Sequence, residues 1–396
     1  MKVIHLLPAL EQGGVETVVC DLVREFGSNV GMWKYENAGN GENGGMGKWE
    51  SVVVSKGGRL VETVEAEGGR HIALDLKSKN PLTYFTRAWK LRRILRAEKP
   101  DLVCAHSRVP AWLYVGVRRI NSVIRSFGHS VIDPPWISYA HGANSVSRYS
   151  EVMTKGDLVI VPSRFLADYL KANYGTPEEK IRVIPNAVDT KRFDPNSLDQ
   201  AFIAEKRREW GIREGDRVLM AIGRITPVKG LEELIREFGR RDVRVASKGK
   251  EDSSFVQTRQ DAASTRKWKL VIVGGTDRHH QKYLESLKVL SSSLIPDPSS
   301  LIFAGPQEKI PECISIADEI VSANTTKPET FGLSVVEAYA MNKPVRAKRF
   351  GGVAEVMEAV EKAGKPTLRE AVVSLYAPCL QAERTLAAYQ EALDMV

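Results

Sequence analysis

The 396-residue sequence has no apolar run long enough to cross a membrane, and no biased tract dominates it. Hydrophobic residues make up 43% and charged residues 27%, a balance typical of a globular protein. These absences argue against a membrane-spanning protein and against an intrinsically disordered one. The length suffices for two ordinary domains, each with its own core.

Cysteine is scarce, and the four cysteines are far apart and form no CxxC pair. Each lies in an apolar context, so we expect buried free thiols and a reducing compartment. We expect no signal peptide, because the apolar part of "MKVIHLLPALEQGG" is short and is followed by polar residues and a glycine pair. We interpret this stretch as a first buried strand and expect a cytoplasmic protein.

Positive charge is in excess, with a formal net charge of +8. It gathers between residues 85 and 125, where ten Lys or Arg face only two acids. Such a patch suggests an anionic partner, namely a membrane surface, a phosphorylated substrate or nucleic acid, although an ordinary solvated helix face fits the charge equally well. The helix "TRAWKLRRILRAE" carries Arg87, Lys90, Arg93 and Arg96 at three- and four-residue steps, which predicts a cationic outer face. We expect this face to bind anionic lipid of the inner membrane.

Short apolar runs alternate with amphipathic helices throughout the chain, for example "DLVIVPS" before "RFLADYLKANY" and "KLVIVGG" before "KYLESLKVL". Fully apolar strands between helices predict parallel sheets covered on both faces, and the repetition in both halves predicts two such sheets. The fold class is therefore α/β. A polar segment at 186–197 separates an N-terminal domain, 1–188, from a C-terminal domain, 196–375, and we expect a final helix within 376–396 to cross back to the first domain.

The ends of the strands in the N-terminal half carry candidate binding residues, because ligands of such sheets lie beyond the carboxyl ends of strands. Gly13 and Gly14 precede a helix whose free N–H groups could face an anion, although a purely structural turn is an equal alternative. His141, beside Gly142, could donate a hydrogen bond to a substrate hydroxyl or phosphate. The alternative is a structural histidine whose hydrogen bonds are all made within the protein. His106, after "DLVCA", is a weaker candidate.

The C-terminal half places two cations at a strand end and a helix start. Arg224 follows the strand in "AIGRITPVKG", and Lys229 comes five residues later, an arrangement that can hold a diphosphate. In "VIVGG", Gly274 and Gly275 would let a base lie close to the backbone.

Two carboxylates, Glu329 and Glu337, flank a glycine turn in "KPETFGLSVVEAYA". Glu329 precedes the turn, and Glu337 lies about one turn into a helix that we expect to begin near Leu333. A nucleotide-sugar needs such a set: N–H groups and cations for its diphosphate, one carboxylate for the ribose and one for the sugar. The segment between the carboxylates supplies the remaining predicted binding residues: Phe331, Gly332, Leu333 and Ser334.

Four motifs together resemble one enzyme family. "PETFGLSVVEAYAMNKPV" resembles the Glu-x7-Glu signature of retaining glycosyltransferases of the GT-B fold, group 1 (family 4). "IGRITPVKG" resembles the phosphate-binding segment of that family, "VIPNAVDTKRF" its interdomain segment, and "FGGVAEVM" the helix after its last strand. The resemblance covers nearly the whole chain. Within the family, the chain resembles the transferases that build bacterial cell-surface glycans and lipopolysaccharide. Arg346, Lys348 and Arg349 depart from it, since the family usually has small apolar residues there.

The resemblance implies two Rossmann-like domains facing across a cleft, with the N-terminal one binding the acceptor and the C-terminal one the nucleotide-sugar. It implies that Glu337 holds the ribose, that Glu329 lies by the donor sugar, and that Arg224 and Lys229 hold the diphosphate. From the N-terminal domain, His141 would be an active-site residue, and the glycine pair would lie at the phosphates or the acceptor. The donor expected is a UDP-sugar, and no metal or other cofactor is expected, in agreement with the lack of any Asp-x-Asp pair.

Two other functions stay open at this stage. A nucleotide-sugar epimerase could use the same scaffold, but it lacks the Glu-x7-Glu signature. A non-enzymatic basic protein could bind nucleic acid through aromatics interleaved with the basic patch, such as Trp89 and Trp112, but the two sheets and the phosphate-binding cations would then be unexplained. The sugar, the base and the acceptor are not determined by these motifs.

Overall fold

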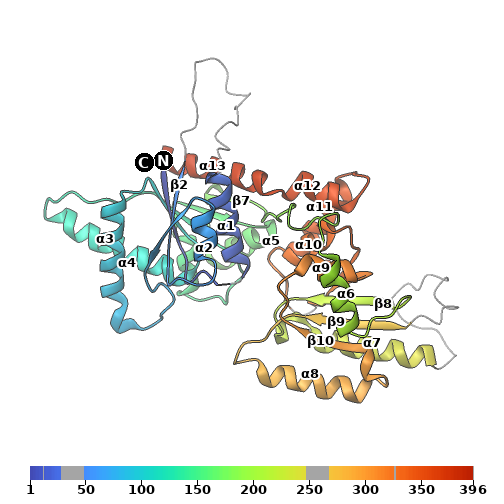
Figure 1. The fold of residues 1–396 in the computed structure, drawn as a ribbon. Coiled ribbons are helices and arrows are strands. Elements are labelled where there is room, and N and C mark those ends of the chain that lie inside the picture. Colours follow the sequence, from blue (N-terminus) through green and yellow to red (C-terminus); the bar gives the residue numbers. More distant parts are fainter. Residues whose placement is uncertain (12, 28–48, 247–266, 325–326, 396) are drawn as a thin grey trace. The chain divides into compact units, whose positions relative to one another are not determined.

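The computed structural model describes residues 1–11, 13–27, 49–246, 267–324 and 327–395, and it divides into two compact units (Figure 1). Unit 1 comprises residues 1–189 and 376–396, and unit 2 comprises residues 190–375. Each unit is built around one parallel sheet with helices packed against it. The two sheets predicted from the alternation of apolar runs and helices are therefore both present.

Unit 1 contains a seven-stranded sheet in which every neighbouring pair is parallel, in the order β3-β2-β1-β4-β5-β6-β7. The strands are β1 (Lys2–Leu6), β2 (Glu50–Ser55), β3 (Arg70–Ala73), β4 (Leu102–Ala105), β5 (Trp136–Tyr139), β6 (Leu158–Val161) and β7 (Ile181–Val183). The helices are α1 (Gly14–Gly27), α2 (Val61–Ala66), α3 (Tyr84–Glu98), α4 (Arg108–Ser126), α5 (Arg164–Tyr174) and α13 (Pro378–Asp394).

The strands of unit 1 are apolar along their length because both faces of the sheet are buried. In β4, Val103 and Ala105 pack into the core on one face, whereas Leu102 and Cys104 pack into the core on the other. This two-residue alternation within a continuous apolar run is what a parallel sheet covered by helices requires.

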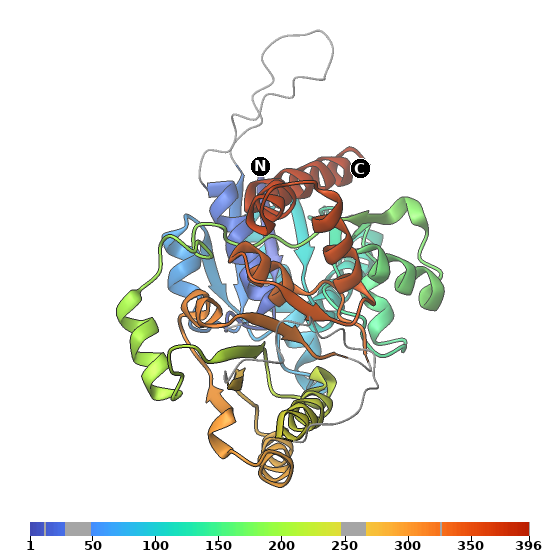
Figure 2. The same ribbon diagram turned by 90° about the vertical axis from the view of Figure 1, so that its right-hand side faces the viewer.

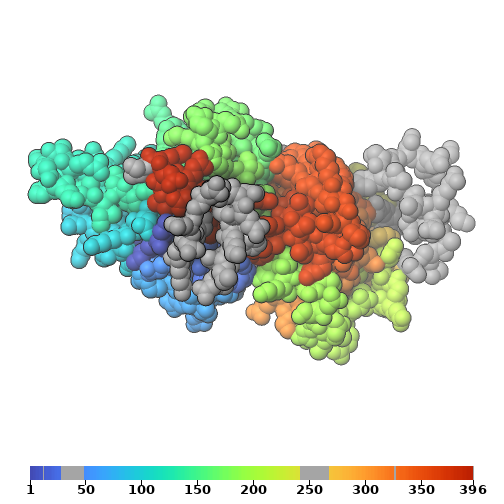
Figure 3. Space-filling model, turned by 90° about the horizontal axis from the view of Figure 1, so that it is seen from above, coloured from blue at the N-terminus to red at the C-terminus, as the bar shows by residue number. Residues whose placement is uncertain are grey.

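The last helix of the chain, α13, belongs to unit 1. It lies beside α1 in both ribbon views (Figures 1 and 2), and its end lies against green segments of unit 1 in the space-filling view (Figure 3). Gln381 donates a hydrogen bond from Nε2 to the Tyr139 hydroxyl at 3.0 Å, and Tyr389 is fully buried in the same core. Near the end of the helix, Glu391 accepts from Arg182 Nε at 2.7 Å.

Unit 2 contains a five-stranded sheet with parallel neighbours, in the order β10-β9-β8-β11-β12. Its strands are β8 (Arg217–Ile222), β9 (Trp268–Val273), β10 (Leu301–Gly305), β11 (Glu319–Ser322) and β12 (Val345–Ala347). Its helices are α6 (Gln200–Glu209), α7 (Leu231–Ala246), α8 (Gln281–Leu294), α9 (Ile310–Ile316), α10 (Leu333–Ala340), α11 (Gly352–Lys362) and α12 (Leu368–Tyr376), the last of which ends at the first residue of the returning segment.

The cationic face predicted for α3 is wrong in part. Arg87 is buried and donates hydrogen bonds to the carbonyl oxygens of Ser78 and Asn80 at 2.7 and 3.1 Å. Its guanidinium group therefore binds the loop that precedes α3. Arg92 is also buried and donates to Asn121 Oδ1 at 2.8 Å. Trp89, by contrast, is 49% exposed.

Among the described residues, no helix combines the length and the apolar character that crossing a membrane would require.

Candidate active site

The carboxyl end of β8 in unit 2 leads into the two predicted phosphate-binding cations. Arg224 is exposed and forms no ion pair with any described residue, while Lys229 closes a short 3-10 turn, Pro227–Lys229. Gly230 follows with φ of +64°, and a Cβ there would lie 1.9 Å from the Ala323 carbonyl oxygen. Only glycine fits this close approach, which holds Lys229 against the end of β11.

Lys229 and Glu329, predicted separately for phosphate and sugar, form an ion pair with each other. The same carboxylate oxygen of Glu329 also accepts a hydrogen bond from Asn324 Nδ2 at 2.9 Å. The two charged side chains are only 30% and 15% exposed, so the pair is partly shielded from solvent. A diphosphate that uses Lys229 must therefore share or displace this carboxylate.

Asn324 is a site residue that the sequence reasoning missed. It is 6% exposed, lies just beyond β11 and lines a narrow pocket together with Arg224, Lys229 and Ser334. Its Oδ1 has no hydrogen-bond partner among the described residues. A polar side chain directly after an apolar strand was the available signal, since such positions lie at the ligand-binding edge of a parallel sheet.

Helix α10 begins at Leu333, where the sequence predicted it. Gly332 precedes it with φ of +96°, and a Cβ there would meet Val353 Cγ2 at 2.7 Å. The Gly332 carbonyl accepts from Val335 N at 2.9 Å, while the N–H groups of Leu333 and Ser334 precede the first intrahelical bond. Phe331 is 5% exposed and packs inward, so it anchors the turn.

Glu337 lies one turn into α10 and is partly buried. Burial raises the pKa of its carboxyl to about 7, although the positive charges of Arg192 and Lys229 act in the opposite direction. The predicted ribose carboxylate is therefore close to two cations, one of which, Arg192, was not predicted. Near neutral pH, Glu337 changes between its neutral and ionised forms.

The glycine pair after β9 has a backbone role in unit 2. Gly274 has φ of +152°, and a Cβ there would lie 1.9 Å from the Gly223 carbonyl oxygen. The Gly275 carbonyl accepts from Ile225 N at 2.9 Å, so the segments after β8 and β9 are joined through their backbones. The predicted contact of Gly274 and Gly275 with a base stays a prediction.

The glycine pair of unit 1 opens α1, as the sequence analysis expected. The Gly13 carbonyl accepts from the backbone N and the hydroxyl of Thr17, both at 3.0 Å, and α1 begins at Gly14. A Cβ at Gly13 would lie 2.6 Å from a carboxylate oxygen of Glu16, in the first turn of the helix. This acid was not considered in the prediction, and its charge opposes that of an anion bound there.

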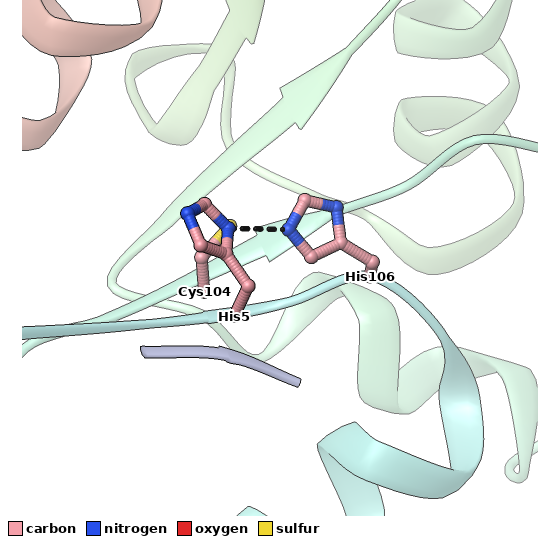
Figure 4. A group of neighbouring side chains, drawn as sticks. All are labelled: His5, Cys104 and His106. Atoms are coloured by element: carbon pink, nitrogen blue, oxygen red, sulfur yellow. Dashed lines mark hydrogen bonds between the residues drawn. The ribbon is translucent and has the colours of Figure 1, made fainter. Parts of the chain in front are cut away.

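His141 follows β5 and contacts a second histidine. Its Nε2 lies 3.1 Å from Nδ1 of His106, and its ring stacks on Tyr139 with the centroids 4.4 Å apart. His106 in turn lies 3.0 Å from His5, through Nε2 and Nδ1 respectively (Figure 4). Burial lowers the pKa of His141 and of His5 to about 3, and it lowers the pKa of His106 well below its usual value.

The structure therefore brings the predicted residues together in two sets. Unit 2 holds the cations and both carboxylates around β8, β11 and α10, and unit 1 holds His141 and the glycine pair. Of the charged departures from the family pattern, Arg346 and Arg349 pair with acids of unit 2, Glu319 and Glu361, at 3.0 and 2.9 Å.

Two protein families match the chain, each over one of these regions. Glycosyltransferase Family 4 matches residues 48–192, and Glycosyl transferases group 1 matches residues 202–365. Among curated relatives, D-inositol 3-phosphate glycosyltransferase of Acidothermus cellulolyticus is 28% identical over 207 residues, 52% of this chain and 41% of its own length. Lipopolysaccharide 1,2-N-acetylglucosaminetransferase of Salmonella typhimurium is 24% identical over 280 residues, 70% of this chain and 62% of its own length. The aligned part thus spans roughly half the length of these relatives.

Solved glycosyltransferase structures share the fold over the whole chain. A glycosyltransferase of Rickettsia africae has a TM-score of 0.75 at 20% identity, and covers 100% of this chain and 99% of its own. Anabaena HepE, solved in complex with UDP and glucose, has a TM-score of 0.69 at 16% identity and covers 98% and 99%. The predicted fold class and the predicted resemblance to group 1 glycosyltransferases are both confirmed, whereas retention of configuration stays a prediction.

Proposed function

We propose that this chain, which belongs to the group 1 glycosyltransferases with the GT-B fold, transfers a sugar from a nucleotide-diphosphate sugar to a glycan acceptor. One observation carries the proposal. In unit 2, Arg224 and Lys229 stand at a strand end beside two carboxylates, Glu329 and Glu337, on either side of the N-terminus of α10. Cations, N–H groups and carboxylates are the three kinds of group that a nucleotide-sugar requires.

The charges of the site suggest a role for each side chain. Arg224, with no ion pair among the described residues, holds the diphosphate together with Lys229 and stabilises the charge that develops as it leaves. Glu337 accepts hydrogen bonds from the ribose hydroxyls. Glu329, held by Lys229 and Asn324, orients the donor sugar.

We further propose that the reaction retains the configuration of the sugar and uses no metal. No side chain of the described site is an evident nucleophile, so the leaving diphosphate itself would receive the acceptor's proton on the face that the acceptor attacks. Arg224 and Lys229 supply the positive charge that a metal would supply elsewhere. NMR of the anomeric proton in the product tests retention, and activity in excess chelator tests the absence of a metal.

The acceptor that we propose is a membrane-anchored glycan of the bacterial cell surface, reached by a chain that binds peripherally to the cytoplasmic face of the membrane. The resemblance to a lipopolysaccharide transferase supports this class. So does the surface of α3 (labelled in Figure 1) and of the turn before it: Phe85 and Trp89 of α3 are 72% and 49% exposed, and Leu82 in the turn is 86% exposed. Exposed apolar side chains next to Lys90 and Arg93 suit an anionic lipid surface.

Co-sedimentation with anionic and neutral vesicles tests the membrane part. Phe85→Ser should reduce binding to both kinds of vesicle, whereas Lys90→Glu should reduce binding to the anionic kind only and more strongly at low salt. Val289→Ser changes an apolar side chain that is 72% exposed on α8 and serves as the control. Equal binding of all variants would leave the α3 surface without this role.

A screen of nucleotide-sugars for thermal stabilisation tests the donor. A ligand that binds only the folded chain raises its melting temperature, so one base and one sugar should stand out. The chosen donor is then incubated with candidate glycans, and release of the nucleotide diphosphate is measured. The proposal fails if no nucleotide-sugar stabilises the chain, or if the stabilising donor is never consumed.

A further inference from the structure

Three histidines from three neighbouring strands form a continuous row in unit 1. His5 lies in β1 and pairs in register with Cys104 of β4, while His106 and His141 follow β4 and β5. Their nitrogens meet in sequence: His5 Nδ1 with His106 Nε2 at 3.0 Å, and His106 Nδ1 with His141 Nε2 at 3.1 Å. His5 is fully buried and His106 is 2% exposed, so only the His141 end approaches solvent.

A row of this kind has only two possible arrangements of protons when its rings are neutral. Burial disfavours the charged form of all three rings, and no carboxylate contributes to the lowered pKa of any of them. Each neutral ring carries one N–H donor and one bare nitrogen. Either every ring is protonated on Nδ1, with donation running from His5 to His141, or every ring is protonated on Nε2, with donation running the other way.

The buried end of the row distinguishes the two arrangements. His5 Nε2 has no hydrogen-bond partner among the described residues. In the second arrangement this atom would be a buried N–H without an acceptor among the described residues, which costs the desolvation free energy of the donor. In the first arrangement it is a bare lone pair, which is less costly.

We propose that His5 and His106 act as positioning residues that hold His141 in the tautomer with its proton on Nδ1. His141 Nε2 is then occupied by the N–H of His106, and His141 Nδ1 acts only as a hydrogen-bond donor. His141 could then act on a substrate only as a hydrogen-bond donor to an oxygen atom, and it would not serve as a general base. This inference rests on the proposed function, because only a contact with the substrate gives the position of that proton a role in catalysis.

Cys104 raises a competing use of the same side chains. Potential metal-binding atoms of His5, Cys104 and His106 all lie within 4.8 Å of one another (Figure 4). The histidine nitrogens that face each other are already joined at 3.0 Å, and burial raises the pKa of the thiol to about 12. A protonated thiol and an occupied pair of nitrogens favour the hydrogen-bonded row over a metal site.

Long-range proton–nitrogen NMR of the histidine-labelled chain tests the proposal directly, since it reports which nitrogen of each ring is protonated. His5→Phe, His106→Phe and His141→Phe assign the three signals. We expect a proton on Nδ1 and a bare Nε2 in all three rings, unchanged between pH 6 and 8. A proton on Nε2 of His141, or a shift of the His5 and His106 signals with one equivalent of zinc, would overturn the proposal.

Activity variants separate positioning from packing. His106→Phe keeps a ring but removes both bonds, and we expect a fall in kcat of roughly 3- to 10-fold with a mixed His141 tautomer. His106→Gln can donate from its amide nitrogen and accept at its oxygen, so it should recover most of kcat and restore the Nδ1 proton. His71→Gln, at a histidine that pairs with Ser55 in β2, is the control. An equal loss of kcat in His106→Phe and His106→Gln, with the His141 tautomer unchanged, would mean that the histidines only fill space in the core and do not position His141.

The two proposals fail in different ways. If no nucleotide-sugar is ever consumed, the proposed function fails, but the tautomers still test the row. If the donor is consumed and His141 carries its proton on Nε2, the row fails and the proposed function stands.

Discussion

Units 1 and 2 share a parallel-sheet architecture but differ in the groups that they place at the ends of their strands. Unit 1 has a row of neutral histidines joined by hydrogen bonds. Unit 2 has cations and carboxylates, with Lys229 paired to Glu329 and Glu337 close to Lys229 and Arg192. Under the proposed function the difference follows the substrate, because uncharged hydroxyls need oriented neutral donors and a diphosphate needs fixed positive charge.

The largest effect should come from Arg224, because its charge is not compensated by an ion pair with any described residue. We expect Arg224→Ala to lower kcat by roughly 100- to 1,000-fold, the cost of removing one group that stabilises the departing charge. The melting temperature should stay within about 2 °C of wild type, as for a surface substitution.

Arg236→Ala serves as the control, since Arg236 pairs with Glu232 on the surface of α7. A near-normal rate for Arg224→Ala at saturating donor would mean that the diphosphate is held elsewhere and that the charge in unit 2 has another purpose.

A smaller effect is expected at Glu337, which has no counterpart among the neutral groups of unit 1. Glu337→Ala should weaken binding of the nucleotide diphosphate by about 1.5 to 3 kcal/mol, the range for hydrogen bonds to a charged group, or roughly 10- to 150-fold. Calorimetric titration measures it. Glu358→Ala removes a carboxylate that pairs with Lys362 on α11 and is the control. An unchanged dissociation constant would remove Glu337 from the binding site.

The pH dependence should distinguish the two units. Glu337 has a pKa raised to about 7, so the form that accepts ribose hydroxyls is lost as pH falls below 7. Roughly one-tenth of this carboxyl is ionised at pH 6 and nine-tenths at pH 8, so affinity should rise by about tenfold between them. The histidine row, with lowered pKa values, should contribute nothing in this range.

Glu337→Gln is the comparison for this measurement, because the ionisation of the nucleotide itself affects both proteins equally. The ratio of the two dissociation constants should change with pH in the direction given. A constant ratio would show that Glu337 binds equally well in both protonation states.

The smallest effect concerns stability in the absence of substrate. The folded pKa of Glu337 lies above the usual value of 4.5, so the folded state binds more protons than the unfolded state between pH 4.5 and 7. The stability contributed by the protonated form is therefore complete below 4.5 and is lost as pH rises to 7. Glu337→Gln should raise the melting temperature by about 2 to 6 °C at pH 8 and by much less at pH 5. A larger gain at pH 5 would contradict the sign of the pKa shift.

The sequence predicted the parts of the site that are local in the chain. Glu329, the glycine turn and the start of α10 at Leu333 fall within five residues, and their spacing alone places one acid before the helix. Arg224 and Lys229 are likewise separated by one short turn. Backbone geometry over a few residues determines such arrangements, so pattern and resemblance were sufficient.

Residues far apart in the chain were not predictable in the same way. The pairing of Lys229 with Glu329 joins side chains 100 positions apart. Arg87 belongs to the periodic set of cations predicted for α3, yet it is buried and donates to a loop carbonyl. Arg92, another cation of the same basic stretch, is buried and donates to an amide oxygen of α4. Helical spacing predicts the direction in which a side chain points from its helix, but it does not predict which other segment of the chain packs against that side chain.

Two parallel sheets, the family and the charged ends of unit 2 follow from the sequence by itself, because apolar runs, helical periodicity and short motifs report local burial and local geometry. The histidine row was decided by the tertiary structure. His5, His106 and His141 become neighbours only because the sheet order places β4 between β1 and β5, and because the register sets His5 opposite Cys104. Register and strand order are properties of the assembled sheet, where burial on both faces selects one alignment, so hydrogen bonds between strands a hundred residues apart arise only there.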